Sequence, residues 1–104
     1  MKKINVIELN ELMKKEKSIY ILDVRGVSEF EFANLGGVNI PLLQISEFIG
    51  RESRDKKIYC LCHHGVRSAM ACSFLMEHGY NNVINIEGGI DAWTLSIDSK
   101  VPRY

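Results

Sequence analysis

Residues 57–79, KIYCLCHHGVRSAMACSFLMEHG, join a short apolar run to an amphipathic segment, and this junction decides the fold class. Lys57–Cys62 has the composition of a buried strand. The following segment has apolar residues three and four apart and ends at Gly79, which is typical of a helix with a glycine C-cap. A strand that passes directly into a helix is the unit of parallel sheets. The stretch therefore predicts an α/β protein with Cys62 at the carboxyl end of a strand, where such sheets bind ligands.

The rest of the chain repeats this alternation of apolar runs and amphipathic segments. The expected strands are Ile4–Glu8, Ser18–Val24, Gly37–Pro41 and Asn82–Ile86. The expected helices are Leu9–Lys17, residues 28–34, Leu42–Gly50 and residues 90–95. The helix over 28–34 is predicted from a capping box, because Glu31 follows Ser28 by three residues. Strands that alternate with helices are joined in the right-handed sense, so the sheet should be mainly parallel.

The bulk composition indicates one small domain that stays in the cytoplasm. A chain of 104 residues without linkers or repeats fits a single domain over residues 1–104, with an aperiodic tail at 96–104. Thirteen basic residues balance thirteen acidic ones, which argues against nucleic acid or an anionic membrane as partner. No apolar run has the length of a membrane span, and the first ten residues lack a signal-peptide core. Three cysteines, two of them one residue apart, favour free thiols in a reducing compartment.

The stretch CLCHHGVRS, Cys60–Ser68, allows two chemical interpretations, of which the first is a metal site. Two cysteines and two histidines within five residues are potential zinc ligands. A structural zinc site usually takes its ligands from two separated pairs, however, and neither Cys72 nor His78 belongs to a second pair. The positive charge of Arg67 would also repel a bound cation. The sequence therefore predicts no metal here.

The second interpretation is a cysteine nucleophile. A free cysteine has an ordinary pKa of about 8.5 and is mostly thiol at neutral pH, whereas attack requires the thiolate. A loop between a strand end and a helix N-terminus turns backbone N–H groups inward, which would favour a thiolate at Cys62. Gly65 permits such a loop, Arg67 offers forked donors for an oxyanion, and Ser68 can cap the helix. A buried structural cysteine is the alternative, but it leaves the glycine and the arginine unexplained.

Three separated motifs resemble those of the rhodanese (sulfurtransferase) family. They are LDVRGVSEFEFANLGGVNIPL at Leu22–Leu42, CHHGVRS at residues 62–68 and NVINIEGGIDAW at Asn82–Trp93. The resemblance covers nearly the whole chain and implies a three-layer α/β/α fold with a central parallel sheet. Ala33 and Asn34 replace the glycine–histidine pair that many members carry, and we expect this departure to affect the surface or packing rather than the chemistry.

The resemblance also implies the roles of the site residues. Cys62 and Arg67 would be catalytic, the cysteine forming a persulfide and the arginine binding an anionic donor. The substrate-binding residues would be His63, His64, Gly65, Val66, Arg67 and Ser68. The implied reaction moves a sulfane sulfur from thiosulfate or a persulfide donor to cyanide, a small thiol or a protein cysteine, without a cofactor.

Two rival functions belong to the same fold. Phosphatases and arsenate reductases place five residues between cysteine and arginine, whereas four separate Cys62 from Arg67. Non-catalytic interaction modules typically lose the cysteine, which this chain keeps. Sulfur transfer is therefore the preferred hypothesis.

Some residues outside the loop also receive an expected role. Arg25 is expected to pair with Glu29 at the same end of the sheet. Cys60 lies one strand repeat before the nucleophile, a spacing that suits a disulfide poorly, so we expect a packing residue rather than a resolving thiol. Gly88 and Gly89 should permit a close backbone approach beside the site.

Overall fold

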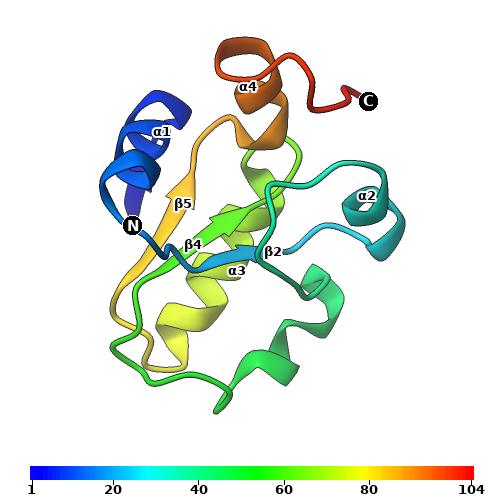
Figure 1. Cartoon of the computed structure of the whole chain (residues 1–104). Helices are drawn as coiled ribbons and strands as arrows, with labels where there is room; N and C mark the ends of the chain where they lie inside the picture. Colours follow the sequence, from blue (N-terminus) through cyan, green and yellow to red (C-terminus); the bar gives the residue numbers. More distant parts are fainter.

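The computed structural model describes residues 1–104 and contains a five-stranded sheet with helices on both faces (Figure 1). The strands are β1 (Lys2–Ile4), β2 (Ile21–Asp23), β3 (Val38–Asn39), β4 (Ile58–Leu61) and β5 (Val83–Ile86). Their order is β1-β5-β4-β2-β3, and every neighbouring pair is parallel, as predicted. Because β4 is the central strand, Cys62 follows it at the middle of the sheet's carboxyl edge.

Two separate cores, one on each face of the sheet, make the fold a three-layer α/β/α sandwich. The helices are α1 (Val6–Lys15), α2 (Val27–Phe32), α3 (Val66–Glu77) and α4 (Gly89–Ser96), with a 3-10 helix η1 at Leu42–Phe48. Ile58 and Cys60 of β4 pack in the core formed with α3 and η1, whereas Tyr59 and Leu61 pack in the core formed with α1 and α4. This alternation is the two-residue period of a strand buried on both faces. The short α2 buries none of its residues and lies beyond the carboxyl end of β2 (Figure 1).

The predicted strand over Ile4–Glu8 is wrong for most of its length. β1 ends at Ile4, and the next residue, Asn5, caps α1. The Asn5 side-chain oxygen accepts a hydrogen bond from the Glu8 N–H (2.8 Å), and the Glu8 carboxylate accepts one from the Asn5 N–H (3.1 Å). Such a reciprocal capping box satisfies two free backbone donors and ends the strand.

The predicted capping box of Ser28 and Glu31 is also wrong. α2 begins at Val27, after Gly26, and the Glu29 carboxylate accepts a hydrogen bond from the Gly26 N–H (3.0 Å). The N-cap is therefore Gly26, two residues before the predicted Ser28, because the Glu29 carboxylate can accept from the N-cap N–H even when the N-cap residue has no side chain. This start holds the Glu29 carboxylate at the edge of the site.

The segment predicted as a helix over Leu42–Gly50 is confirmed as helical, but it is the 3-10 helix η1. Its buried residues Ile45 and Phe48 are three apart, which puts them on one face of a helix with three residues per turn. The remaining strands and helices lie where the sequence predicts them, with bounds that differ by a few residues. None of the helices combines the length and apolarity that crossing a bilayer requires.

Candidate active site

Cys62 lies between the end of β4 and the start of α3, in the loop that the sequence singles out. Gly65 is the N-cap of α3 and has φ +105°, a left-handed conformation that glycine adopts readily. The Gly65 N–H points at the Cys62 sulfur, with a nitrogen–sulfur distance of 3.0 Å. A backbone donor at a helix N-terminus favours negative charge on the sulfur. The Cys62 residue is 1% exposed.

A buried polar chain connects the sulfur to β5. The Ser68 hydroxyl oxygen lies 3.3 Å from the Cys62 sulfur, and the same hydroxyl hydrogen-bonds to the side-chain oxygen of Asn85. Asn85 in turn donates to the Gly65 carbonyl (3.1 Å) and so anchors the loop. Because a hydroxyl has one hydrogen, Ser68 can donate to Asn85 while accepting from a Cys62 thiol, or rotate to donate to a thiolate. The prediction that Ser68 caps α3 is wrong, since the cap is Gly65 and no side chain caps that end.

Gly89 permits the tight contact between the loop and α4 that the sequence predicts. The Cys62 carbonyl accepts a hydrogen bond from the Ile90 N–H (2.9 Å), and the His63 carbonyl accepts one from the Asp91 N–H (3.1 Å). A Cβ at Gly89 would overlap both carbonyl groups, and Gly89 has φ +63°. Only glycine therefore allows α4 to hold the loop at this distance.

Arg67, the expected anion-binding residue, is paired with a carboxylate. Its two terminal nitrogens donate to the two Glu29 carboxylate oxygens at 2.7 and 2.9 Å. The hydrogen bonds from Arg67 lower the pKa of Glu29 to about 2, helped by the Gly26 N–H and the Tyr104 hydroxyl and opposed by burial. The same hydrogen bonds raise the pKa of Arg67. The ion pair is therefore charged at every physiological pH.

The predicted pair of Arg25 with Glu29 is wrong, because Arg25 pairs with Asp23. Its guanidinium contacts the Asp23 carboxylate at 2.7 and 2.9 Å, and both side chains are fully buried. Arg25 also donates to the backbone carbonyls of Ala33 (2.6 Å) and Glu29 (3.3 Å). Burial disfavours the charged guanidinium, but the bonds to Asp23 and Tyr104 outweigh it and raise the pKa of Arg25. This network fixes the segment between β2 and α2, and with it the position of Glu29.

The C-terminal segment packs on the site, an outcome that the aperiodic sequence of residues 96–104 does not predict. It runs from α4 towards α2 (Figure 1). The Tyr104 hydroxyl donates to Glu29 (2.8 Å) and accepts from Arg25 (2.9 Å), and its ring stacks on His63 with centroids 4.0 Å apart. Burial raises the pKa of Tyr104. The tyrosine therefore links the loop to the ion pair.

His63, His64 and Asp91 form the one group of side chains whose ligand atoms are close enough to suggest a metal ion, lying within 4.8 Å of one another. The two imidazole rings lie against each other, with centroids 4.0 Å apart and planes tilted by 31°. Asp91 is also bonded to Arg103 (2.9 Å), which lowers the pKa of its carboxyl group. A cation at this place would therefore have to compete with the Arg103 guanidinium for the Asp91 carboxylate.

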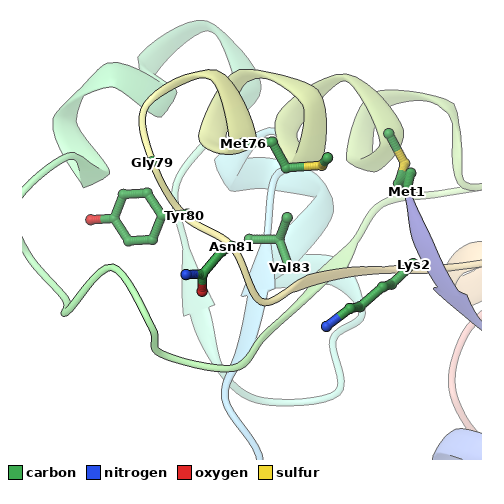
Figure 2. A pocket seen from close by; sticks show the side chains of 7 residues that line it. All are labelled: Met1, Lys2, Met76, Gly79, Tyr80, Asn81 and Val83. Atoms are coloured by element: carbon green, nitrogen blue, oxygen red, sulfur yellow. The ribbon is translucent and has the colours of Figure 1, made fainter.

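The hollows of the surface do not coincide with the nucleophile. The largest, about 540 Å³, lies at the amino end of the sheet between β1, β5 and the end of α3, lined by Met1, Met76, Tyr80 and Val83 among others (Figure 2). A hollow of about 390 Å³ at the opposite end is lined by Glu29 and Arg67 together with residues at the starts of α2 and η1. The residues that line it include both members of the ion pair but not Cys62.

Three residues of the site escape prediction from the sequence. Asn85 could have been noticed as the single polar residue inside the apolar run over Val83–Ile86. The sequence pairs Glu29 with Arg25 rather than with Arg67, and Tyr104 carries no local signal at all. Each acts through contacts with residues far away in the chain.

Comparisons with known proteins agree on the family. The sequence model of the rhodanese-like domain matches residues 5–96. The chain is 31% identical to thiosulfate sulfurtransferase GlpE of Shewanella oneidensis, over 84% of this chain and 89% of that protein. It is 34% identical to the putative sulfur carrier protein YrkF of Bacillus subtilis, over 88% of this chain but only 50% of that protein. The crystal structure of a rhodanese-related protein from Thermoplasma volcanium matches 98% of this chain and 96% of its own, with 36% identity and a TM-score of 0.80. The chain therefore belongs to the rhodanese-like domain family.

Proposed function

We propose that the protein is a sulfurtransferase that carries a sulfane sulfur on Cys62. The observation that supports this most is the position of the Cys62 sulfur, which faces the Gly65 N–H at the N-terminus of α3. The family membership and the name of the Shewanella oneidensis relative support sulfur transfer as the general chemistry. The substrate site is formed by the loop residues His63, His64, Gly65, Val66, Arg67 and Ser68.

The proposed reaction has two displacement steps at sulfur. In the first, the Cys62 thiolate attacks the outer sulfur of thiosulfate, the sulfur–sulfur bond of the donor breaks, and sulfite leaves with its electron pair. In the second, cyanide or a thiolate attacks the outer sulfur of the Cys62 persulfide and regenerates the Cys62 thiolate. Charge and atoms balance in both steps, so no metal or redox cofactor is needed. The backbone donor at Gly65 stabilises the anionic forms of Cys62 before and after transfer.

The chemistry of the two steps defines the chemical classes of the sulfur donor and the sulfur acceptor. The donor is thiosulfate or a persulfide, and the acceptor is cyanide, a small thiol or a protein cysteine. All three cysteines are free and buried, which fits a reducing compartment such as the cytoplasm.

Turnover with a Cys62→Ser variant tests the proposal. The variant should lose transfer from thiosulfate to cyanide by more than about a thousandfold, since an alcohol is a far weaker nucleophile than a thiolate. Its unfolding midpoint should stay close to that of the unmodified protein, because serine fits the same volume. Transfer at the unmodified rate by a folded Cys62→Ser variant would show that another group carries the sulfur.

Hydrolysis of an aryl phosphate separates the proposal from the rival phosphatase function. The loop has four residues between Cys62 and Arg67, one fewer than that of the phosphatases, so it has one backbone donor fewer and less room for the three equatorial oxygens of a phosphoryl group. The Arg67 guanidinium is also bonded to Glu29, and a phosphate would have to displace that carboxylate. We expect no hydrolysis above background. Efficient cleavage that depends on Cys62 would make the phosphatase function the better one.

A further inference from the structure

Every arginine around the mouth of the site is already paired with a carboxylate. The pairs are Arg67–Glu29 at 2.7 Å, Arg25–Asp23 at 2.7 Å and Arg103–Asp91 at 2.9 Å. The two histidines of the loop are held in a stack with Tyr104 and with each other. A doubly charged anion such as thiosulfate therefore meets no free guanidinium at this end of the sheet, although charge-assisted donors are what usually binds an oxyanion.

Glu29 is held so that it cannot easily release Arg67. Its carboxylate accepts four hydrogen bonds, two from Arg67, one from the Gly26 N–H (3.0 Å) and one from the Tyr104 hydroxyl (2.8 Å). The two oxygens match the two donors of the guanidinium fork, which is the geometry that a sulfonate-like oxyanion would otherwise adopt there. The carboxylate therefore occupies the position on Arg67 that the oxygens of thiosulfate would need.

We propose that Glu29 is a specificity-determining residue that disfavours thiosulfate and favours an alkyl persulfide, R–S–SH, which has no sulfonate group, as the sulfur donor. This inference rests on the proposed function of Cys62. Thiosulfate must displace a charged carboxylate from Arg67, and its own charge is repelled by Glu29 if the carboxylate stays. An alkyl persulfide carries no oxyanion and has no need of the guanidinium, so the Arg67–Glu29 pair can stay intact while the donor binds.

The persulfide donor requires no additional reactant. The Cys62 thiolate attacks the outer sulfur of R–S–SH, the donor's sulfur–sulfur bond breaks, and R–S⁻ leaves with the electron pair. The products are Cys62–S–SH and a thiolate that takes a proton from water. The hollow beside Glu29 and Arg67, about 390 Å³, has apolar walls from Val24, Pro41, Leu42 and Leu43. These walls suit the alkyl group of a persulfide better than the hydrated oxygens of thiosulfate.

The test compares kcat/KM for two donors, thiosulfate and 2-hydroxyethyl persulfide, with cyanide as the acceptor. The unmodified protein should prefer the persulfide. Glu29→Gln keeps the size of the side chain and an acceptor for the Gly26 N–H but removes the charge, so it should raise the thiosulfate-to-persulfide ratio by about tenfold or more, mainly through a lower KM for thiosulfate. Glu31→Gln, an exposed change on the same helix, is the matched control and should leave the ratio unchanged.

A double variant tests whether the gain in Glu29→Gln comes from the Arg67 guanidinium, once it is free of the Glu29 carboxylate. Glu29→Gln with Arg67→Gln should lose the gain in the ratio, because no guanidinium is left to bind the oxyanion. Should Glu29→Gln fail to fold, Tyr104→Phe removes one of the bonds to Glu29 and should raise the ratio in the same direction by about twofold. An unchanged ratio in the folded variant, or an equal gain in the double variant, overturns the role of Glu29. If neither donor adds sulfur to Cys62 in any of these proteins, the proposed function fails and this inference with it.

Discussion

The two ends of the sheet differ in what lies beneath their surface. At the carboxyl end, the buried polar side chains of Asp23, Arg25, Ser68 and Asn85 each have a hydrogen-bond partner and surround or support Cys62. At the amino end, a larger hollow is lined mainly by methionine, valine and tyrosine (Figure 2). The volume of a hollow therefore reflects apolar side chains that are incompletely covered. The chemical reactivity of an end of the sheet depends instead on polar side chains that the fold removes from water and pairs with each other.

The largest expected effect is the loss of a buried charge at the carboxyl end. Arg25→Met would leave the fully buried Asp23 carboxylate without its partner, and we expect the free energy of unfolding to fall by about 3–5 kcal/mol. Lys2→Met removes an exposed cation at the amino end and should change it by less than about 0.5 kcal/mol. Urea denaturation measures both. Equal losses for the two variants would mean that the buried pair is not what stabilises the carboxyl end.

A second comparison uses two glycines with left-handed backbones. Gly89→Ala introduces a Cβ that overlaps the Cys62 and His63 carbonyls, so we expect a loss of at least about 2 kcal/mol together with loss of sulfur transfer. Gly50, whose N–H donates to Tyr80 at the other end, has φ +86° but nothing within 4 Å of such a Cβ. Gly50→Ala should therefore lose only about 1 kcal/mol, the conformational strain alone, and keep activity. An active Gly89→Ala variant of unchanged stability would contradict the close approach.

The third comparison concerns two cysteines on one strand. Cys60 is fully buried among apolar side chains, and a hydrogen bond with Cys72 together with burial raises its pKa, so it is a poor nucleophile. Cys60→Ala should lose about 1–2 kcal/mol of stability and keep most of the sulfur-transfer rate. The measurement is the turnover rate of each folded variant. If Cys60→Ala loses as much turnover as Cys62→Ser does, Cys60 acts as a resolving thiol instead.

The smallest expected effect is a change in acid stability. Arg67 depresses the pKa of Glu29 from 4.5 to about 2, so the ionised carboxylate stabilises the folded state above pH 4.5, and this stabilisation disappears as the pH falls towards 2. Glu29→Gln should flatten that part of the stability curve, whereas Glu31→Gln should not. Thermal unfolding between pH 5 and about pH 2.5 measures the difference. Parallel curves for the two variants would show that the Arg67 pair contributes nothing to folding.

The sequence predicts the parts of this molecule that depend on local pattern. The strand, loop and helix around Cys62 follow from hydrophobic period and from glycine at one position, and the parallel sheet follows from the alternation of strands with helices. The hydrophobic pattern misplaces the start of α1, because Asn5 stands within an apolar run. Its role as the N-cap depends on the hydrogen bonds that it exchanges with Glu8. Boundaries of this kind depend on one side-chain hydrogen bond rather than on the period.

The candidate site is predictable only in part, for a different reason. Cys62, Gly65 and Arg67 lie close together in the chain, so their spacing alone indicates a loop that can hold an anion. The partner of Arg67 lies 38 positions away in α2, and Tyr104 lies 75 positions from the same carboxylate. Pairing between such distant residues depends on how the elements pack, which a single sequence does not encode in any local pattern.

Intact-mass measurement of the protein after incubation with thiosulfate or 2-hydroxyethyl persulfide tests the central claim most directly. The protein should gain one sulfur atom, which cyanide removes and which Cys62→Ser prevents. Cys60 and Cys62 are not separated by a lysine or arginine, so fragmentation of their shared tryptic peptide must assign the sulfur, and it should be found on Cys62. No gain of mass with either donor, or a gain located on Cys60 or Cys72, would show that Cys62 does not carry the transferred sulfur.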